Sequence, residues 1–149
     1  MIHFFICLGQ NGTVRLQRYF VKYSNNIQKE ILNIIKLSID NKDKEEKSHH
    51  FILKLENPLL QLIFKRYNGL YFILGIENND SSLLALESIP FFVELLDAYF
   101  VNVCELDLVY NVPIVYRILD EIFLGGSFVL ADKEKILNNV KLLDSVFTL

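Results

Sequence analysis

The first half of the chain contains short runs in which apolar residues alternate with polar ones or stand unbroken, a pattern typical of β-strands. The pattern predicts five strands, over residues 2–8, 13–19, 51–55, 60–65 and 70–76. Turn residues separate them, because Gly9 to Gly12 joins the first pair and Asn68-Gly69 joins the last pair. Residues 70–76 have no polar face, so we expect this strand to be central and covered on both sides.

In the other segments apolar residues recur every three or four positions, which is the period of an amphipathic helix. Helices are predicted over residues 27–41, 82–100, 113–124 and 132–143, with one helical turn in CELDLVYN. Asn25 and Asn26 are expected to cap the first helix, and Asp132 is expected to cap the last.

Each predicted helix has one apolar side, which we expect to face the core. These sides comprise Ile27, Ile31, Ile34, Ile35 and Ile39; Leu83, Leu86, Ile89, Val93, Leu96 and Phe100; Ile114, Ile118, Leu119 and Ile122; and Ile136, Val140 and Leu143. Pro90 lacks a backbone N–H, so it predicts a kink near residues 86–90. Gly125 and Gly126 are expected to cap the C-terminus of the helix that Pro113 opens.

The order of elements is strand, strand, helix, three strands and then helices. We predict an α/β (α+β) fold in which a five-stranded antiparallel sheet carries helices on its faces. At 149 residues the chain is long enough for a single domain, 1–149, and too short for two. Within it, residues 1–77 are expected to form the sheet with the first helix, residues 81–143 the helical part, and residues 144–149 a short tail.

Composition narrows the class of protein. With a net charge of −3 and a pI near 5.6, the chain has no basic stripe to bind phosphates, so no nucleic-acid partner is expected. Hydrophobic side chains make up 52% of the chain, with 12 Phe and 7 Tyr, which favours apolar surface covered by another chain. The apolar N-terminus is too short for a membrane span and lacks a cleavage site, so we expect a cytoplasmic protein.

The cysteine and histidine residues do not form a metal motif. Cys7 and Cys104 lie in apolar surroundings without C-x-x-C spacing, so buried free thiols are favoured over a disulfide. His49 and His50 are adjacent in a charged loop over residues 41–50 and are expected at the surface. We therefore predict no metal site and no cofactor.

The chain contains no G-x-S-x-G, phosphate-binding glycine loop or H-E-x-x-H, which are common catalytic motifs. Carboxylates on or near helices are usually solvated or interact with the helix dipole. Those of this chain are Asp97, Glu105, Asp107, Asp120 and Glu121. No catalytic residue is assigned, and we do not expect an enzyme.

Several stretches resemble one known family. In LIFKRYNGLYF, residues 62–72, two aliphatic residues, an aromatic and a basic residue precede Leu-Tyr-Phe, with Phe64 where the family usually has tyrosine. The most specific stretches are FVELLDAYFVNVCELDLVYN, residues 92–111, and VYRILDEIFLGG, residues 115–126. The opening MI-F and the residues Gly12, Arg15 and Leu16 are similar too. Up to about Leu143, the chain resembles the clathrin adaptor complex small chains, or sigma chains.

This resemblance implies a longin-like fold and a place as the smallest subunit of a heterotetrameric adaptor complex. Its partners would be a large adaptin chain with an N-terminal solenoid, a second large chain and a medium (mu) chain. Such complexes recruit membrane cargo, so the chain is expected on coated-vesicle, Golgi, trans-Golgi or plasma-membrane coated-pit membranes, which it reaches only through the complex. The residues leave open whether the complex is of the trans-Golgi, endocytic or non-clathrin type.

The resemblance also implies a site for acidic dileucine signals, in which an acidic residue is followed three intervening residues later by Leu-Leu or Leu-Ile. The leucine pockets of the family carry over onto Leu70, Val93, Asn102, Val103 and Leu108, with Asn68 at the rim. Arg15 matches the position that faces the acidic residue of the signal. Gln10 and Thr13 beside Arg15 make this hairpin less basic than is usual in the family, so attraction for an acidic signal should be weaker.

Other interpretations of these residues remain open. Leu70, Val93, Val103 and Leu108 would be apolar in any core, and Arg15 would suit a salt bridge to a large chain. The alternative function is a purely architectural longin subunit of a coatomer-like or vesicle-fusion assembly, without a peptide pocket.

Overall fold

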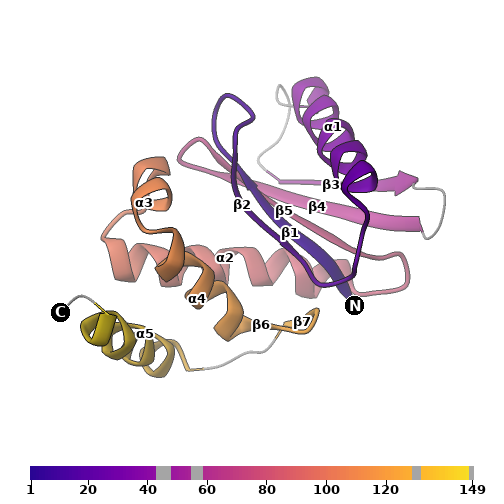
Figure 1. Cartoon of the computed structure of the whole chain (residues 1–149). Helices are drawn as coiled ribbons and strands as arrows, with labels where there is room; N and C mark the ends of the chain where they lie inside the picture. Colours follow the sequence, from indigo (N-terminus) through magenta and orange to yellow (C-terminus); the bar gives the residue numbers. More distant parts are fainter. Residues whose placement is uncertain (43–47, 55–58, 129–131, 148–149) are drawn as a thin grey trace.

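In the computed structural model, which describes residues 1–42, 48–54, 59–128 and 132–147, a sheet lies between two layers of helices (Figure 1). The strands are β1 (Ile2–Leu8), β2 (Val14–Tyr19), β3 (Ser48–Lys54), β4 (Leu59–Tyr67) and β5 (Leu70–Glu77). They pair antiparallel in the order β2-β1-β5-β4-β3. The expected strand over residues 70–76 is therefore central, as predicted, and its first seven residues are buried.

Turn chemistry fixes the register of the β4–β5 hairpin. Tyr67 pairs with Leu70, and the two residues between them, Asn68 and Gly69, have positive φ angles of 49° and 79°. Positive φ at both central residues is the requirement of a type I′ turn, which Asn-Gly meets better than most sequences. The prediction of a hairpin at this position is confirmed.

Each face of the sheet has its own hydrophobic cluster. On one face, helix α1 (Asn25–Lys42) packs against β1, β4 and β5 through Ile31, Ile35 and Ile39. On the other face lie α2 (Ser82–Phe100), α3 (Glu105–Tyr110), α4 (Val112–Ile122) and α5 (Lys133–Phe147), as Figure 1 shows. This arrangement agrees with the prediction of an α/β fold with helices on both faces.

The first helix differs from the prediction at its N-terminus. The side chain of Ser24, and not of Asn25 or Asn26, accepts a hydrogen bond from the Ile27 N–H at 3.4 Å. Ile27 is 38% exposed and takes no part in the apolar side. It lies in the first turn, before the helix reaches the sheet, so spacing alone was insufficient to place it.

Helix α2 has the predicted bounds, but its buried side is rotated. Leu83 is 64% exposed, whereas Ala85, Ser88 and Phe92 are buried with Ile89. The helix is continuous through Pro90. The hydroxyl of Ser88 donates to the Ala85 carbonyl at 2.7 Å, which satisfies this polar group inside the apolar contact.

The helix that follows Pro113 ends two residues earlier than predicted. Strands β6 (Phe123–Leu124) and β7 (Ser127–Phe128) form a second, two-stranded sheet, so the single five-stranded sheet that we predicted accounts for only part of the strands. Gly125 and Gly126 are the turn of this hairpin and not a helix cap, with φ angles of 56° and 87°. Phe123 is buried in the core and the Gly126 carbonyl accepts from the Ile2 N–H at 2.7 Å, so tertiary contacts hold the hairpin.

Three further predictions need correction. Helix α5 continues to Phe147, so most of the expected short tail is helical, and Leu143 is 39% exposed. Strand β3 begins at Ser48, so His49 and His50 lie in a strand and not in a loop. Cys104 is exposed, although Cys7 is buried as expected and both thiols are free. The expected strand end at Leu55 lies outside the described residues.

Other predicted positions are confirmed. Asp132 caps α5, since its side chain accepts from the Glu134 N–H at 3.0 Å. Ile118, Leu119, Ile122, Ile136 and Val140 are buried, whereas Ile114 is only partly buried.

Candidate functional site

The predicted site residues lie where the second half of the chain packs against the ends of two hairpins. Arg15, near the start of β2, is in contact with α3, because its Nε donates to Glu105 Oε1 at 2.8 Å. Asn68, in the β4–β5 turn, donates from Nδ2 to the Val103 carbonyl at 3.4 Å. Segments up to 90 residues apart in sequence therefore meet at the α2–α3 connection.

The ion pair between Arg15 and Glu105 is closely packed. Both side chains are 30% exposed, and a Cβ atom at Gly9 would overlap the Glu105 carboxylate. The absence of a side chain at Gly9 thus lets Glu105 reach the sheet. An ion pair at this degree of exposure contributes about 1 kcal/mol at most.

The four apolar residues of the predicted pocket are closed to solvent. Leu70, Val93, Val103 and Leu108 belong to the core cluster between the sheet and α2, and none is more than 5% exposed. Asn102 and Asn68 are exposed beside them. In this conformation the four side chains pack as core residues, and a ligand would reach them only after the elements around them move.

That connection has an unusual backbone. Val101 and Asn102 have φ angles of 57° and 67°, in the left-handed region. This region is costly for a β-branched residue such as valine, and local strain of about 1–3 kcal/mol is maintained only where the surroundings fix it. Strain of this kind occurs often at binding sites.

Polar contacts hold the connection in place. The Val103 N–H donates to Asp97 Oδ1 at 2.9 Å, so both backbone groups of Val103 are bound, one by Asp97 and the other by Asn68. The Cys104 N–H donates to Asp107 Oδ2 at 3.0 Å, which caps α3. Together with the Arg15–Glu105 pair, these contacts fix the segment that carries Val103.

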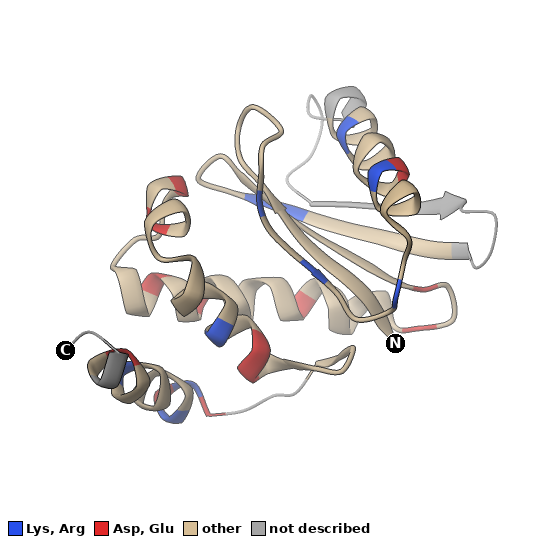
Figure 2. Cartoon of the chain, in the orientation of Figure 1, with Lys and Arg blue, Asp and Glu red and all other residues tan. Residues whose placement is uncertain are grey.

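Basic residues of β2 face acidic residues of the neighbouring helices α3 and α4. Figure 2 shows basic positions on this strand and acidic positions on α3 and α4. Arg18 Nη2 lies 2.8 Å from Asp120 Oδ2 and its guanidinium lies 4.8 Å from the centre of the Tyr116 ring. The Tyr116 hydroxyl accepts from the Gln17 N–H at 2.9 Å and donates to the Gln17 carbonyl at 3.1 Å. The edge of β2 is therefore covered by α4 at this point.

Cys7 lies close enough to the ion pair to be affected by it. Burial raises the pKa of the Cys7 thiol well above its usual value, the charge of Glu105 raises it further, and Arg15 opposes both effects. This thiol therefore stays protonated at neutral pH.

Sequence reasoning identified Arg15 but did not identify its partner. Glu105 and Asp97 were interpreted as carboxylates of solvated helix surfaces, whereas both hold the α2–α3 connection. The acidic start of α3 in CELD was the available signal. It did not reveal the partner, because an acidic first turn of a helix is common for reasons of the helix dipole alone.

The part of the chain that the structure describes lacks two further features. It contains no group of three or more His, Cys, Asp or Glu residues placed to hold a metal ion. None of its helices is long and apolar enough to span a membrane.

Comparison with known proteins identifies the class. A model of the family described as "Clathrin adaptor complex small chain" matches residues 1–147. The chain belongs to this family.

Similar individual proteins are small subunits of different adaptor complexes. The AP-2 complex subunit sigma of Saccharomyces cerevisiae is 38% identical over 146 residues, covering 96% of this chain and 97% of that protein. The AP-2 complex subunit sigma of Dictyostelium discoideum is 36% identical over 146 residues, covering 98% and 99%. The AP-1 complex subunit sigma-3 of Homo sapiens is 41% identical over 131 residues, covering 85% and 79%.

The fold is similar to that of a chain in a homology model of the full-length AP-3 complex in a stretched open conformation. The TM-score is 0.72 and the sequence identity 26%, over 98% of this chain and 95% of that chain. This chain is therefore a sigma-type small subunit of an adaptor complex.

Proposed function

We propose that this sigma-type subunit helps to recognise acidic dileucine signals in cargo tails. Arg15 faces the acidic residue of the signal, while Leu70, Val93, Val103 and Leu108 form the walls of the leucine pockets. Asn102 bonds to the peptide backbone, and Asn68 lies at the rim. The chain binds and does not catalyse.

The observation that supports this proposal most is the convergence of these residues. They come from β2, the β4–β5 hairpin, α2, the α2–α3 connection and α3. Contacts at 2.8 Å and 3.4 Å nevertheless join Arg15 and Asn68 to the segment that carries Val103. The four apolar side chains share one cluster beneath that segment. A cation beside an apolar cluster matches a ligand that has an acidic residue near two leucines.

The energetics suit a weak and reversible interaction. Each leucine that enters an apolar pocket contributes about 1.5–3 kcal/mol before the ordering of the peptide is subtracted. The free energy needed to move the closed pocket walls reduces the net binding free energy further. Several complexes on one membrane would compensate through avidity.

The proposal includes the partners of the chain. They are a large adaptin with an N-terminal solenoid, a second large chain and a medium chain, and through them the subunit reaches coated-vesicle, Golgi, trans-Golgi or plasma-membrane coated-pit membranes. We also assign the fold to the longin-like type. The relatives belong to both AP-2 and AP-1 complexes, so the complex is to be identified by its large chain.

A second candidate function is that of a purely architectural longin subunit. The burial of Leu70, Val93, Val103 and Leu108 favours it, because core residues need no ligand to explain them. This alternative predicts assembly of the complex without any binding of a dileucine peptide.

Peptide binding to the chain with its large-chain partner tests the proposal. The probes are a synthetic peptide with Glu, three intervening residues and Leu-Leu, and the same peptide with Gln in place of Glu. We expect the complex to prefer the acidic peptide and Arg15→Gln to remove that preference. Val103→Ser should lower the affinity for both peptides about tenfold, because a polar group then lines the pocket.

Arg18→Gln is the matched control, since Arg18 is on the same strand and has an ion pair of the same 2.8 Å length. It should leave the preference for the acidic peptide intact. Thermal unfolding of Val103→Ser verifies that the variant is folded. If folded Val103→Ser binds as the wild type does, these residues are not the pocket.

A further inference from the structure

The cation that the proposed function assigns to the ligand already has an internal partner. Arg15 Nε donates to Glu105 Oε1 at 2.8 Å, and Gly9 leaves the space that the carboxylate occupies. A carboxylate of the same kind as that of an acidic signal therefore binds Arg15 when no ligand is present. The two carboxylates compete for one guanidinium group.

The competing residue also belongs to the segment that carries two of the pocket residues. Glu105 lies between Val103 and Leu108, which are 2% and 0% exposed. Just before Val103 the backbone is in the left-handed region at Val101 and Asn102. Release of Glu105 would remove one of the contacts that keep this strained connection in place.

We propose that Glu105 is a built-in competitor for the acidic residue of the cargo signal and that its ion pair with Arg15 closes the segment over residues 101–108. This inference rests on the proposed function, and it concerns the regulation of the same site. Binding then exchanges one carboxylate for another at Arg15, and the released segment uncovers the leucine pocket.

The exchange gives the acidic residue of a signal a role beyond attraction. A ligand without it must open the segment and leave the Arg15 guanidinium unpaired, whereas an acidic ligand replaces the bond that it breaks. The site then also discriminates between ligands by the number of residues that separate the acidic residue from the leucines. The acidic residue must reach Arg15 while the leucines enter the pocket of the same opened segment.

A different interpretation is that Glu105 only stabilises the fold. In that case removal of its charge would loosen the structure without any gain in peptide affinity. One interpretation predicts tighter peptide binding and the other predicts none, so peptide titration separates them.

The test compares Glu105→Gln with the wild type, each as the full chain with its large-chain partner. The acidic dileucine peptide and its Gln counterpart are the probes. Glutamine keeps the size of the side chain and weakens the contact with Arg15. Opening the segment therefore costs less free energy in the variant. We expect both peptides to bind about two- to fivefold more tightly, the range for a partly exposed ion pair.

Asp120→Asn is the control. It removes one negative charge from an ion pair of the same 2.8 Å length with the same strand, but Asp120 lies on α4 and not on the closing segment. It should leave the affinity unchanged, which excludes a general effect of net charge. If the wild type binds the acidic peptide and Glu105→Gln binds it no more tightly, the inference is overturned.

Amide hydrogen exchange provides a readout that needs no peptide. We expect faster exchange over residues 103–108 in Glu105→Gln than in the wild type or Asp120→Asn, because the segment opens more often. Equal exchange rates would overturn the inference even if peptides bind. Faster exchange with no peptide binding by either protein would instead refute the proposed function, and with it the role of Glu105 as a competitor.

Discussion

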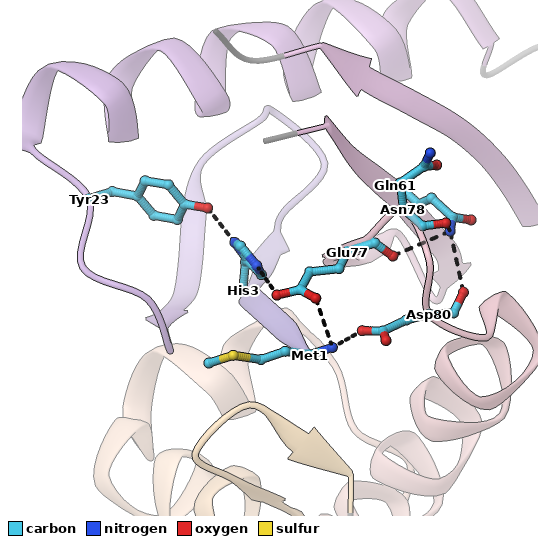
Figure 3. A network of polar contacts seen from close by, with 7 residues as sticks. All are labelled: Met1, His3, Tyr23, Gln61, Glu77, Asn78 and Asp80. Atoms are coloured by element: carbon cyan, nitrogen blue, oxygen red, sulfur yellow. Dashed lines mark hydrogen bonds and ion pairs between the residues drawn. The ribbon is translucent and has the colours of Figure 1, made fainter. Parts of the chain in front are cut away.

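A buried histidine, His3, holds the start of β1. His3 lies at an irregularity of the β1–β5 register and is only 5% exposed. Figure 3 shows it between Tyr23 and Glu77. Its Nδ1 is 2.5 Å from the Tyr23 hydroxyl and its Nε2 is 3.1 Å from Glu77 Oε1. When Tyr23 donates to Nδ1, the Nε2–H is free to donate to Glu77, so the neutral ring satisfies both partners.

The same cluster extends to the turn that leads into α2. Gln61 Nε2 donates to the backbone carbonyl of Asn78 at 2.7 Å, and the N-terminal amine forms an ion pair with Asp80. The hydrogen bond from His3, followed by the positive charge of the N-terminus, lowers the pKa of Glu77 from its usual 4.5. Polar groups thus connect the N-terminus, the β2–α1 connection and the β5–α2 turn.

This lowered pKa predicts how stability depends on pH. A carboxyl group whose pKa is lower in the folded state stabilises the protein above its usual pKa and loses that effect as the pH falls through the folded-state value. We expect Glu77→Gln to lower the melting temperature at pH 7, and the difference from the wild type to shrink below pH 4.5. Thermal unfolding followed by circular dichroism over this pH range measures it.

Glu87→Gln is the control for that experiment, because Glu87 is exposed on α2. Its effect should be small and should not follow the same pH course. A difference between Glu77→Gln and the wild type that stays constant down to about pH 3 would contradict the assigned role of Glu77.

At the scale of elements, α5 docks on other helices. It packs on α4 and α2, and Ile136 and Val140 are its buried side chains. The Tyr99 hydroxyl of α2 donates to Asp144 Oδ2 of α5 at 2.9 Å. Burial, together with this hydrogen bond and the charge of Asp144, raises the pKa of Tyr99 to about 12.

Loss of this hydrogen bond should loosen the docking of α5. We expect Tyr99→Phe to lower the free energy of unfolding at pH 7 by about 1 kcal/mol. A group whose pKa is raised on folding stabilises the protein below its usual pKa and loses this effect as the pH rises through the folded-state value. For Tyr99 these values are 10 and about 12. The difference in unfolding free energy between Tyr99→Phe and the wild type should therefore narrow between pH 10 and about pH 12. Urea unfolding at several pH values measures both effects.

Tyr110→Phe is a suitable control, since Tyr110 is 78% exposed on α3. It should change the free energy of unfolding by only a few tenths of a kcal/mol. If Tyr99→Phe changes it no more than Tyr110→Phe does, the contact between Tyr99 and Asp144 does not hold α5.

At the scale of the whole molecule, large apolar side chains remain at the surface on several helices. They include Leu37, Leu83, Leu84, Val101, Leu106, Tyr110 and Leu142, all more than 50% exposed. Exposed apolar side chains in such number suit a chain that is covered by neighbours in an assembly.

Affinity purification of the tagged full chain tests this view and identifies the complex. We expect a large adaptin chain to co-elute, with a second large chain and a medium chain, and mass spectrometry then shows whether the complex is of the AP-1, AP-2 or another type. Recovery of a stable monomer without any adaptin would contradict the proposed place in a complex.

Patterns between near neighbours were sufficient for much of the fold. The alternation of residues 60–65, the Asn68-Gly69 turn and the unbroken apolar run after it predicted the central hairpin, and the bounds of α2 were predicted correctly. These features depend on side-chain period and turn chemistry, which act over a few residues. The family resemblance, carried by local motifs, is confirmed by the comparisons.

Tertiary contacts decided the features that were predicted wrongly or not at all. Gly125-Gly126 suits a helix cap as well as a hairpin turn, and the contact of this hairpin with Ile2 selects the turn. Residue type likewise could not show that Cys104 is exposed, that Leu83 faces outward or that Glu105 pairs with Arg15. Each depends on how elements far apart in sequence dock, because the final position of an element determines which side of it is covered and which charges meet.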